Sequence, residues 1–107
     1  VRNLRESGAS AIHMVVSCPP TRHPCPYGID FSSKGELIAA QKGEVADIAK
    51  FIGLDSLHYL SLEGMVAATN MNPDHFCLAC YSGHYPLKPP ANIGKFCFEK
   101  QETASLF

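Results

Sequence analysis

The pattern of hydrophobic and polar residues predicts a helix followed by a strand at the start of the chain. Val1 and Leu4 lie three positions apart, as on one face of a helix, and Gly8 follows as a helix stop. Residues 11–16 are apolar at nearly every position, which is typical of a strand covered on both faces in a parallel sheet. Because a helix leading into a strand is half of a βαβ unit, we expect an earlier strand upstream of Val1, in a longer protein.

Hydrophobic periodicity then stops over residues 17–33. This segment contains four prolines, each of which fixes its own φ angle and restrains the residue before it, so we expect a stiff loop. Loops of this length are uncommon inside a compact domain and are usually functional. The segment carries Cys18, His23 and Cys25.

Helical patterns return after the loop. Ser33 and Glu36 have the spacing of a capping box, which predicts a helix over residues 35–40. A second helix is predicted from residue 44 to residue 52, with Gly53 as its stop. A short strand over residues 57–60 and a helix over residues 62–69, capped by Ser61, follow. These elements together predict an α/β fold.

Composition and charge exclude several classes of partner. The 107 residues are 46% hydrophobic and 18% charged, as in one ordinary globular domain. A net charge of -1 gives no electrostatic reason to expect nucleic acid or an anionic membrane as a partner. No run approaches the roughly 18 apolar residues of a membrane-spanning helix, and the first residues lack the hydrophobic stretch of a signal peptide. We therefore expect a cytoplasmic protein.

The cysteines carry the candidate chemistry. Cys77 and Cys80 form a CxxC pair, and Cys25 lies in the stiff proline-containing loop. Three thiolates from two separate loops favour zinc or an iron–sulfur cluster, both of which take four soft ligands, so one ligand is missing. Cys18, which directly follows the first strand, and Cys97, in the predicted tail, both remain open as the fourth.

The same residues allow other interpretations. The CxxC pair can be two small buried side chains, or a thioredoxin-like redox pair, although the residues after Cys80 do not begin an amphipathic helix. Three histidines lie near the cysteines and are interpreted as surface or loop residues: His23, His75 and His84. The two in the strand-like runs, His13 and His58, are interpreted as packed or hydrogen-bonded. No phosphate loop, nucleophile elbow or paired carboxylates are present, so no catalytic residue is predicted.

Several segments, in this order, resemble the glutamine phosphoribosylpyrophosphate amidotransferases, also called amidophosphoribosyltransferases. They are LRESGA at 4–9, IHM at 12–14, PPTRHPCPYGID at 19–30, ELIAA at 36–40, IGLDSL at 52–57, YLSLEG at 59–64 and FCLACYSGHYP at 76–86. The resemblance covers about residues 1–87. It implies the C-terminal portion of a phosphoribosyltransferase-type parallel sheet domain, followed by a helical extension and a cysteine-bearing loop.

The resemblance also implies a division of the chain and an activity. Residues 1–33 would end the phosphoribosyltransferase domain, residues 34–87 would form the extension with the CxxC loop, and residues 88–107 would be a disordered tail. The implied enzyme is a glycosyltransferase that makes 5-phosphoribosylamine from phosphoribosylpyrophosphate and glutamine, in the first committed step of purine synthesis. Its glutaminase domain and phosphoribosyl-binding loop do not map onto this chain, so we expect the chain alone to be inactive.

A cofactor and partners follow from the same resemblance. The iron–sulfur branch of the family holds a [4Fe–4S] cluster with four cysteines, three of which match Cys25, Cys77 and Cys80, while the fourth belongs to a more N-terminal region. The full-length enzyme would use Mg²⁺, not bound by these residues, and would be a homo-oligomer in which the remainder of the same enzyme is the partner of this segment.

Two departures from the family leave an alternative open. Position 18 is commonly serine in the family but is Cys18 here, and the tail from Lys88 looks unlike the usual C-terminus. A local set of Cys18, Cys25, Cys77 and Cys80 would suit zinc, in a small binding module without enzymatic activity. A thiol oxidoreductase would instead require a strongly lowered pKa at Cys77 or Cys80.

Overall fold

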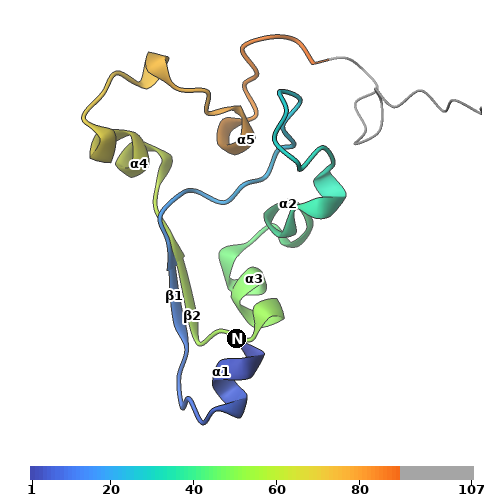
Figure 1. Cartoon of the computed structure of the whole chain (residues 1–107), viewed down its shortest axis with the longest axis vertical. Helices are drawn as coiled ribbons and strands as arrows, with labels where there is room; N and C mark the ends of the chain where they lie inside the picture. Colours follow the sequence, from blue (N-terminus) through green and yellow to red (C-terminus); the bar gives the residue numbers. More distant parts are fainter. Residues whose placement is uncertain (90–107) are drawn as a thin grey trace, which may run out of the picture.

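The structure, a computed structural model, describes residues 1–89 (Figure 1). This part of the chain contains two strands, each preceded and followed by helices. In order they are α1 (Arg2–Glu6), β1 (His13–Val16), the 3-10 helix η1 (Lys34–Glu36), α2 (Ile38–Lys42), α3 (Val45–Ile52), β2 (Ser56–Tyr59), α4 (Leu62–Thr69), the 3-10 helix η2 (Pro73–His75) and α5 (Ala79–Ser82). Among these residues, no helix is long and apolar enough to cross a membrane.

The two strands lie side by side and run parallel, in the register that pairs Met14 with Leu57. The chain between them passes through the long loop, η1, α2 and α3, as parallel pairing requires a crossover connection (Figure 1). The predicted α/β fold with a parallel sheet is confirmed. The strand predicted over residues 57–60 is the second member of this sheet.

The prediction that the first strand is covered on both faces is wrong for the part of the chain that the structure describes. Val15 has 78% of its surface exposed and Met14 has 38%, whereas Ile12 is buried. Helix α3 packs against β2 and covers one face of the pair. Val15 and its partner His58 lie at the same register position, and both are exposed because no described element covers their face.

The core lies between the strand pair and the two helices α2 and α3. Ile48, on α3, is fully buried, and it packs with Ile12, Ala39, Leu54 and Leu57. The helical spacing predicted over residues 44–52 is therefore confirmed, and Gly53 ends α3 in the left-handed conformation with a φ of 86°. This arrangement places the end of α3 next to the start of β2.

The capping box is present, but it does not start an α-helix. The Glu36 carboxylate accepts hydrogen bonds from the Ser33 N–H at 3.0 Å and from the Ser33 hydroxyl at 3.1 Å. The turn that it caps is η1, and α2 begins only at Ile38. Leu37 between them is extended and buried, so its side chain is directed to the interior at the point where the predicted helix is interrupted.

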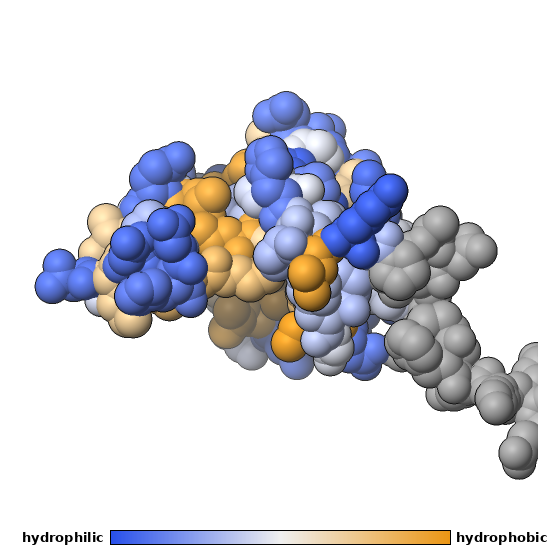
Figure 2. Space-filling view, turned by 90° about the horizontal axis from the view of Figure 1, so that it is seen from above, coloured by the Kyte–Doolittle hydropathy of each residue, from blue (hydrophilic) through white to orange (hydrophobic). Residues whose placement is uncertain are grey.

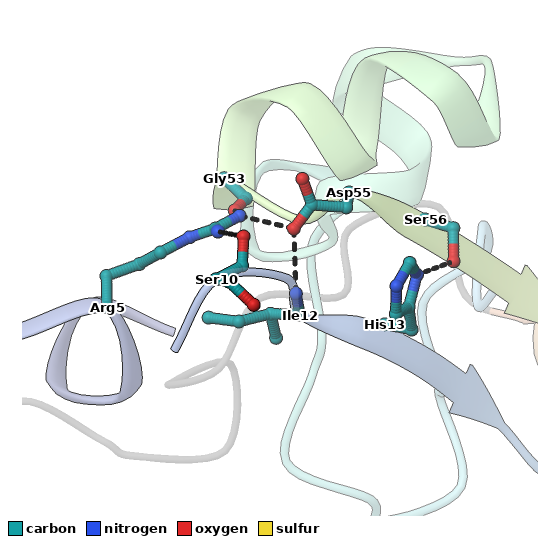
Figure 3. A network of polar contacts seen from close by, with 7 residues as sticks. All are labelled: Arg5, Ser10, Ile12, His13, Gly53, Asp55 and Ser56. Carbon is teal, nitrogen blue, oxygen red and sulfur yellow. Dashed lines mark hydrogen bonds and ion pairs between the residues drawn. The ribbon is translucent and has the colours of Figure 1, made fainter. Parts of the chain in front are cut away.

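Arg5 and Asp55 hold α1 against the starts of both strands (Figure 3). The Arg5 guanidinium donates to the Asp55 carboxylate at 2.5 Å and to the carbonyls of Ser10 and Gly53, at 3.1 Å and 3.3 Å. The same carboxylate oxygen accepts the Ile12 N–H at 2.7 Å. The hydrogen bond from Ile12, followed by that from Arg5, lowers the pKa of Asp55.

Burial of hydrophobic surface is incomplete in this part of the chain. Leu4, Ile29, Phe51 and Met71 each have more than half of their surface exposed. Seen from the end that carries α4 and α5, hydrophobic residues are exposed between hydrophilic regions (Figure 2). The division at residues 33 and 87 stays a prediction, and most of the predicted tail lies outside the described residues.

Candidate metal centre

Cys25 reaches the CxxC segment because the long loop is bonded directly to α5. The N–H groups of Arg22 and His23 both donate to the carbonyl of Cys80, each at 3.1 Å. Figure 1 shows the loop beside α5 although more than fifty residues separate the two along the chain. The loop is closed on itself by the Cys25 N–H, which donates to the Phe31 carbonyl at 3.0 Å.

The CxxC segment combines irregular chain at Cys77 with the single helical turn α5. Cys77 precedes α5, Cys80 lies within it, and Gly83 ends it with a φ of 78°. The ring of His23 lies over Gly83, so that a Cβ built at that position would be 2.9 Å from the imidazole. A glycine is thus needed at position 83 both for the backbone angle and for the close approach of His23.

The three predicted ligands border one cavity of about 220 Å³. Cys25 comes from the loop, and Cys77 and Cys80 come from the CxxC turn. The rest of the lining is apolar or aromatic and consists of Pro24, Pro26, Tyr27, Ile29, Phe31, Ala79 and Tyr85. All three thiols are free, and none is part of a disulfide.

The three cysteines line one cavity from two separate segments. Among residues 1–89, no group of three or more His, Cys, Asp or Glu side chains could hold one metal ion. A single zinc ion needs its sulfur ligands about 2.3 Å from one centre. A cubane iron–sulfur cluster takes one thiolate on each of several iron atoms, so its ligands are spread around a larger volume. Three thiols beside apolar walls are a donor set that either group can take.

The pKa of the Cys80 thiol is raised above its ordinary value. Burial is the main cause that raises the pKa of Cys80, and the negative charges of Cys25, Cys77 and Cys18 raise this pKa further. A thiol oxidoreductase would require the opposite direction, so Cys80 does not support that interpretation. Burial, followed by the charge of Cys25, also raises the pKa of Tyr85.

Cys18 lies close to the site but does not line the cavity. Its sulfur is hydrogen-bonded with the Tyr81 hydroxyl, and burial followed by this hydrogen bond raises the pKa of Tyr81 to about 12. Cys97 lies outside the described residues. Of the four cysteines that the structure describes, Cys25, Cys77 and Cys80 line the cavity and Cys18 does not.

The histidines do not line the cavity either. His75 and His84 are exposed, as predicted for loop residues, and His23 is half-buried over Gly83. His13 is hydrogen-bonded with Ser56 at 2.8 Å, as predicted for a strand histidine, and His58 is exposed.

Tyr27 and Tyr85 also line the cavity, and neither is a candidate site residue from the sequence. Their rings meet edge to face with centroids 6.2 Å apart. The only feature of the sequence that links these tyrosines to the site is their closeness to the cysteines. Tyr27 lies two residues after Cys25, and Tyr85 lies within the segment 76–86 that carries the CxxC pair. Nothing in the sequence indicates that the two rings meet.

Comparison with known proteins gives consistent matches to one enzyme, although no protein-family profile matches the chain. The amidophosphoribosyltransferase of Synechocystis is 53% identical over 90 residues, which are 84% of this chain and 18% of the relative. The enzyme of Mycobacterium leprae is 44% identical over 105 residues, which are 92% of this chain and 19% of the relative. This match is longer than the resemblance over residues 1–87 that the sequence motifs predict.

A solved structure agrees with these sequence matches. The glutamine phosphoribosylpyrophosphate amidotransferase of B. subtilis, in complex with ADP and GMP, superposes with a TM-score of 0.73 at 42% identity. The match covers 83% of this chain and 20% of that chain. The chain thus spans about a fifth of the length of the relatives it matches.

Proposed function

From the premise that this chain is related to the amidophosphoribosyltransferases over more than four fifths of its length, we propose that it works as the C-terminal part of such an enzyme. The whole protein would make 5-phosphoribosylamine from phosphoribosylpyrophosphate and glutamine, in purine synthesis. The identity of 53% with one relative, together with the shared fold, is the observation that supports this function.

The part played by this segment is to carry a structural cofactor, and not to react with substrate. Cys25, Cys77 and Cys80 are three ligands of a [4Fe–4S] cluster whose fourth ligand lies outside this chain. The support is that the three free thiols line one cavity with apolar and aromatic walls. When bound, the cluster cross-links the loop and the CxxC turn through iron–thiolate bonds.

The chain's own residues prepare the site for such a group. The two hydrogen bonds to the Cys80 carbonyl hold the loop against α5 before any metal binds. The apolar lining limits the access of water to the sulfurs, which slows the hydrolysis and oxidation of a bound cluster. Binding of positively charged iron would also relieve the mutual repulsion of the thiolates.

The alternative, a zinc-stabilised module that uses Cys18 as its fourth ligand, has less support. Cys18, the fourth ligand that this alternative needs, does not line the cavity that holds the other three cysteines. Location in the cytoplasm, assembly as a homo-oligomer and the use of Mg²⁺ by the full-length enzyme belong to the same proposal. The partner of this segment is then the remainder of the enzyme.

Two measurements test the proposal. The protein that contains this chain, incubated with glutamine and phosphoribosylpyrophosphate, should release pyrophosphate and form phosphoribosylamine, while residues 1–107 alone should not. Metal analysis of the anaerobically purified protein should find iron with acid-labile sulfide. One zinc per chain would support the module instead, and a folded protein without either metal would contradict both.

A further inference from the structure

We propose that Tyr27 and Tyr85 are positioning residues that hold the Cys25 loop over the CxxC turn, and so set how well Cys25 is placed and protected as a ligand. The identity of the bound group rests on the function proposed above. The placement of Cys25 itself does not depend on it, because it is a property of the chain's own contacts.

Each of the two tyrosines reaches across to the backbone of the segment that holds the other. The Tyr85 hydroxyl donates to the carbonyl of Pro24 at 2.6 Å, directly before Cys25. The Tyr27 hydroxyl donates to the carbonyl of Leu87 at 2.7 Å and accepts the Leu87 N–H at 3.1 Å. The hydrogen bonds are therefore reciprocal and close a ring of contacts between the two segments.

The rings reinforce the same contact. They pack edge to face, with an angle of 70° between their planes, and both line the cavity beside Cys25. Edge-to-face aromatic pairs are favourable beyond the area that they bury. Breaking the hydrogen bonds would therefore weaken the contact without abolishing it.

Tyr27 also contacts the sulfur directly. Its backbone N–H donates to the Cys25 sulfur at 3.4 Å. Hydrogen bonds from amides to a ligand sulfur stabilise the thiolate and tune the reduction potential of an iron–sulfur cluster. Because this N–H moves with the Tyr27 side chain, loss of the Leu87 contact would displace both the loop and the donor.

Other anchors of the loop that the structure describes lie before Cys25. The N–H groups of Arg22 and His23, three and two residues earlier, donate to the Cys80 carbonyl, and the Arg22 guanidinium donates to the Ala39 carbonyl at 2.7 Å. The bond from the Cys25 N–H to Phe31 lies within the loop and does not join it to another element. In the described residues, the two tyrosines thus provide the side-chain contacts that join Pro24 and Tyr27 to the segment after α5.

The test compares Tyr85→Phe, Tyr27→Phe and the double variant with Tyr59→Phe in the protein that contains this chain. Tyr59 packs against the core and does not line the cavity, so Tyr59→Phe is the matched control. The first readout is the rate at which the visible absorption of the anaerobically purified protein bleaches in air. The second is the rate at which iodoacetamide alkylates Cys25 in the metal-free protein, followed by peptide mass spectrometry.

We expect each single variant to raise both rates about 2- to 10-fold, as for loss of one hydrogen bond, and the double variant to raise them further. Rates equal to those of Tyr59→Phe, with unchanged circular dichroism, would overturn the proposal. If the wild-type protein contains no iron, the cluster proposal fails, while the alkylation of Cys25 still decides the role of the tyrosines. A rise in both Cys25 and Cys18 alkylation would indicate general loosening and would also count against a positioning role.

Discussion

Arg5 and Asp55, which are 50 positions apart in the chain, form an ion pair of 2.5 Å that joins α1 to the start of β2. The same carboxylate accepts the N–H of Ile12, just before β1. The Asp55 side chain therefore holds the starts of both strands together, which helps to set the register of the parallel pair (Figure 3). Both partners of the ion pair are partly exposed, so salt should weaken this contact.

The lowered pKa of Asp55 predicts that acid weakens the contact between α1 and the strands. A group whose folded-state pKa is depressed contributes stability above its unfolded pKa, near 3.9, and this contribution is lost as the pH falls through the folded-state pKa. We expect Asp55→Asn to lower the free energy of unfolding at pH 7 and to reduce its decrease between about pH 5 and pH 2. Urea titrations across this pH range would measure both effects.

The exposed carboxylate of Asp74 provides the control. Asp74→Asn should leave the stability at pH 7 nearly unchanged. An Asp55→Asn variant with the stability and acid dependence of the wild-type protein would show that the Arg5–Asp55 pair contributes nothing measurable.

Gly83 is predicted to tolerate substitution less well than other glycines with positive φ. Alanine at position 83 would meet the same left-handed backbone penalty as alanine at Gly53, about 1–2 kcal/mol, and would also collide with the His23 ring at 2.9 Å. Gly53 has a φ of 86° in the same left-handed region, and a Cβ there would meet only the Val1 side chain at an ordinary 3.7 Å, so Gly53→Ala is the matched control. Urea titration should place Gly83→Ala below Gly53→Ala in stability, and alanine at position 83 should displace the His23 ring.

If the two alanine variants are equally stable, the His23 ring can move away without loss of stability. Its position over Gly83 then does not restrict which residue can occupy position 83. Adding His23→Ala to Gly83→Ala should recover the part of the loss that comes from the collision. The backbone penalty should remain in that double variant.

Local signals in the sequence predict the elements whose cause is local. Gly53 is predicted to end a helix and does so, and the Ser61 hydroxyl accepts the Gly64 N–H at 3.0 Å at the start of α4. The capping box of Ser33 and Glu36 is also present. It caps only a 3-10 turn because burial of Leu37 decides where α2 begins, and burial depends on distant residues.

The cysteines of the candidate site could be predicted from the sequence, but the aromatic residues that line the cavity beside them could not. The residue types and spacing single out Cys25, Cys77 and Cys80, and all three line one cavity. The two tyrosines could not be predicted, because the contact of Tyr85 with Pro24 joins residues that are 61 positions apart. Such a contact leaves no periodic or spacing signal in a single sequence.

Ile48 should be the most sensitive core position on α3, because its side chain is fully buried among residues of both strands and α2. We expect Ile48→Ala to lower the free energy of unfolding by about 2–5 kcal/mol, from lost burial and the cavity left behind. Phe51, on the same helix, has 67% of its surface exposed, and the Lys42 ammonium lies 4.3 Å from its ring centre. Phe51→Ala should therefore cost less than about 1 kcal/mol.

A loss with Phe51→Ala as large as that with Ile48→Ala would contradict this placement of the core. It would indicate that the exposed face of α3 is covered in the protein that contains this chain. Comparing denaturant midpoints at equal slope would distinguish such a change in stability from a change in the surface exposed on unfolding.

Cys18 is a ligand in the zinc module but not in the cluster, so substituting it separately from the three cavity cysteines decides between the two. Cys25→Ser removes a thiolate that borders the cavity, whereas Cys18→Ser removes one that contacts Tyr81 outside it. We expect Cys25→Ser and Cys77→Ser to reduce bound iron and sulfide by more than half, and Cys18→Ser to leave both unchanged, in protein purified anaerobically. Serine is nearly the same size as cysteine but is a poor ligand for soft metals, so the comparison isolates ligation from packing. Loss of metal with Cys18→Ser equal to that with Cys25→Ser would mean that the chain supplies a fourth thiolate of its own.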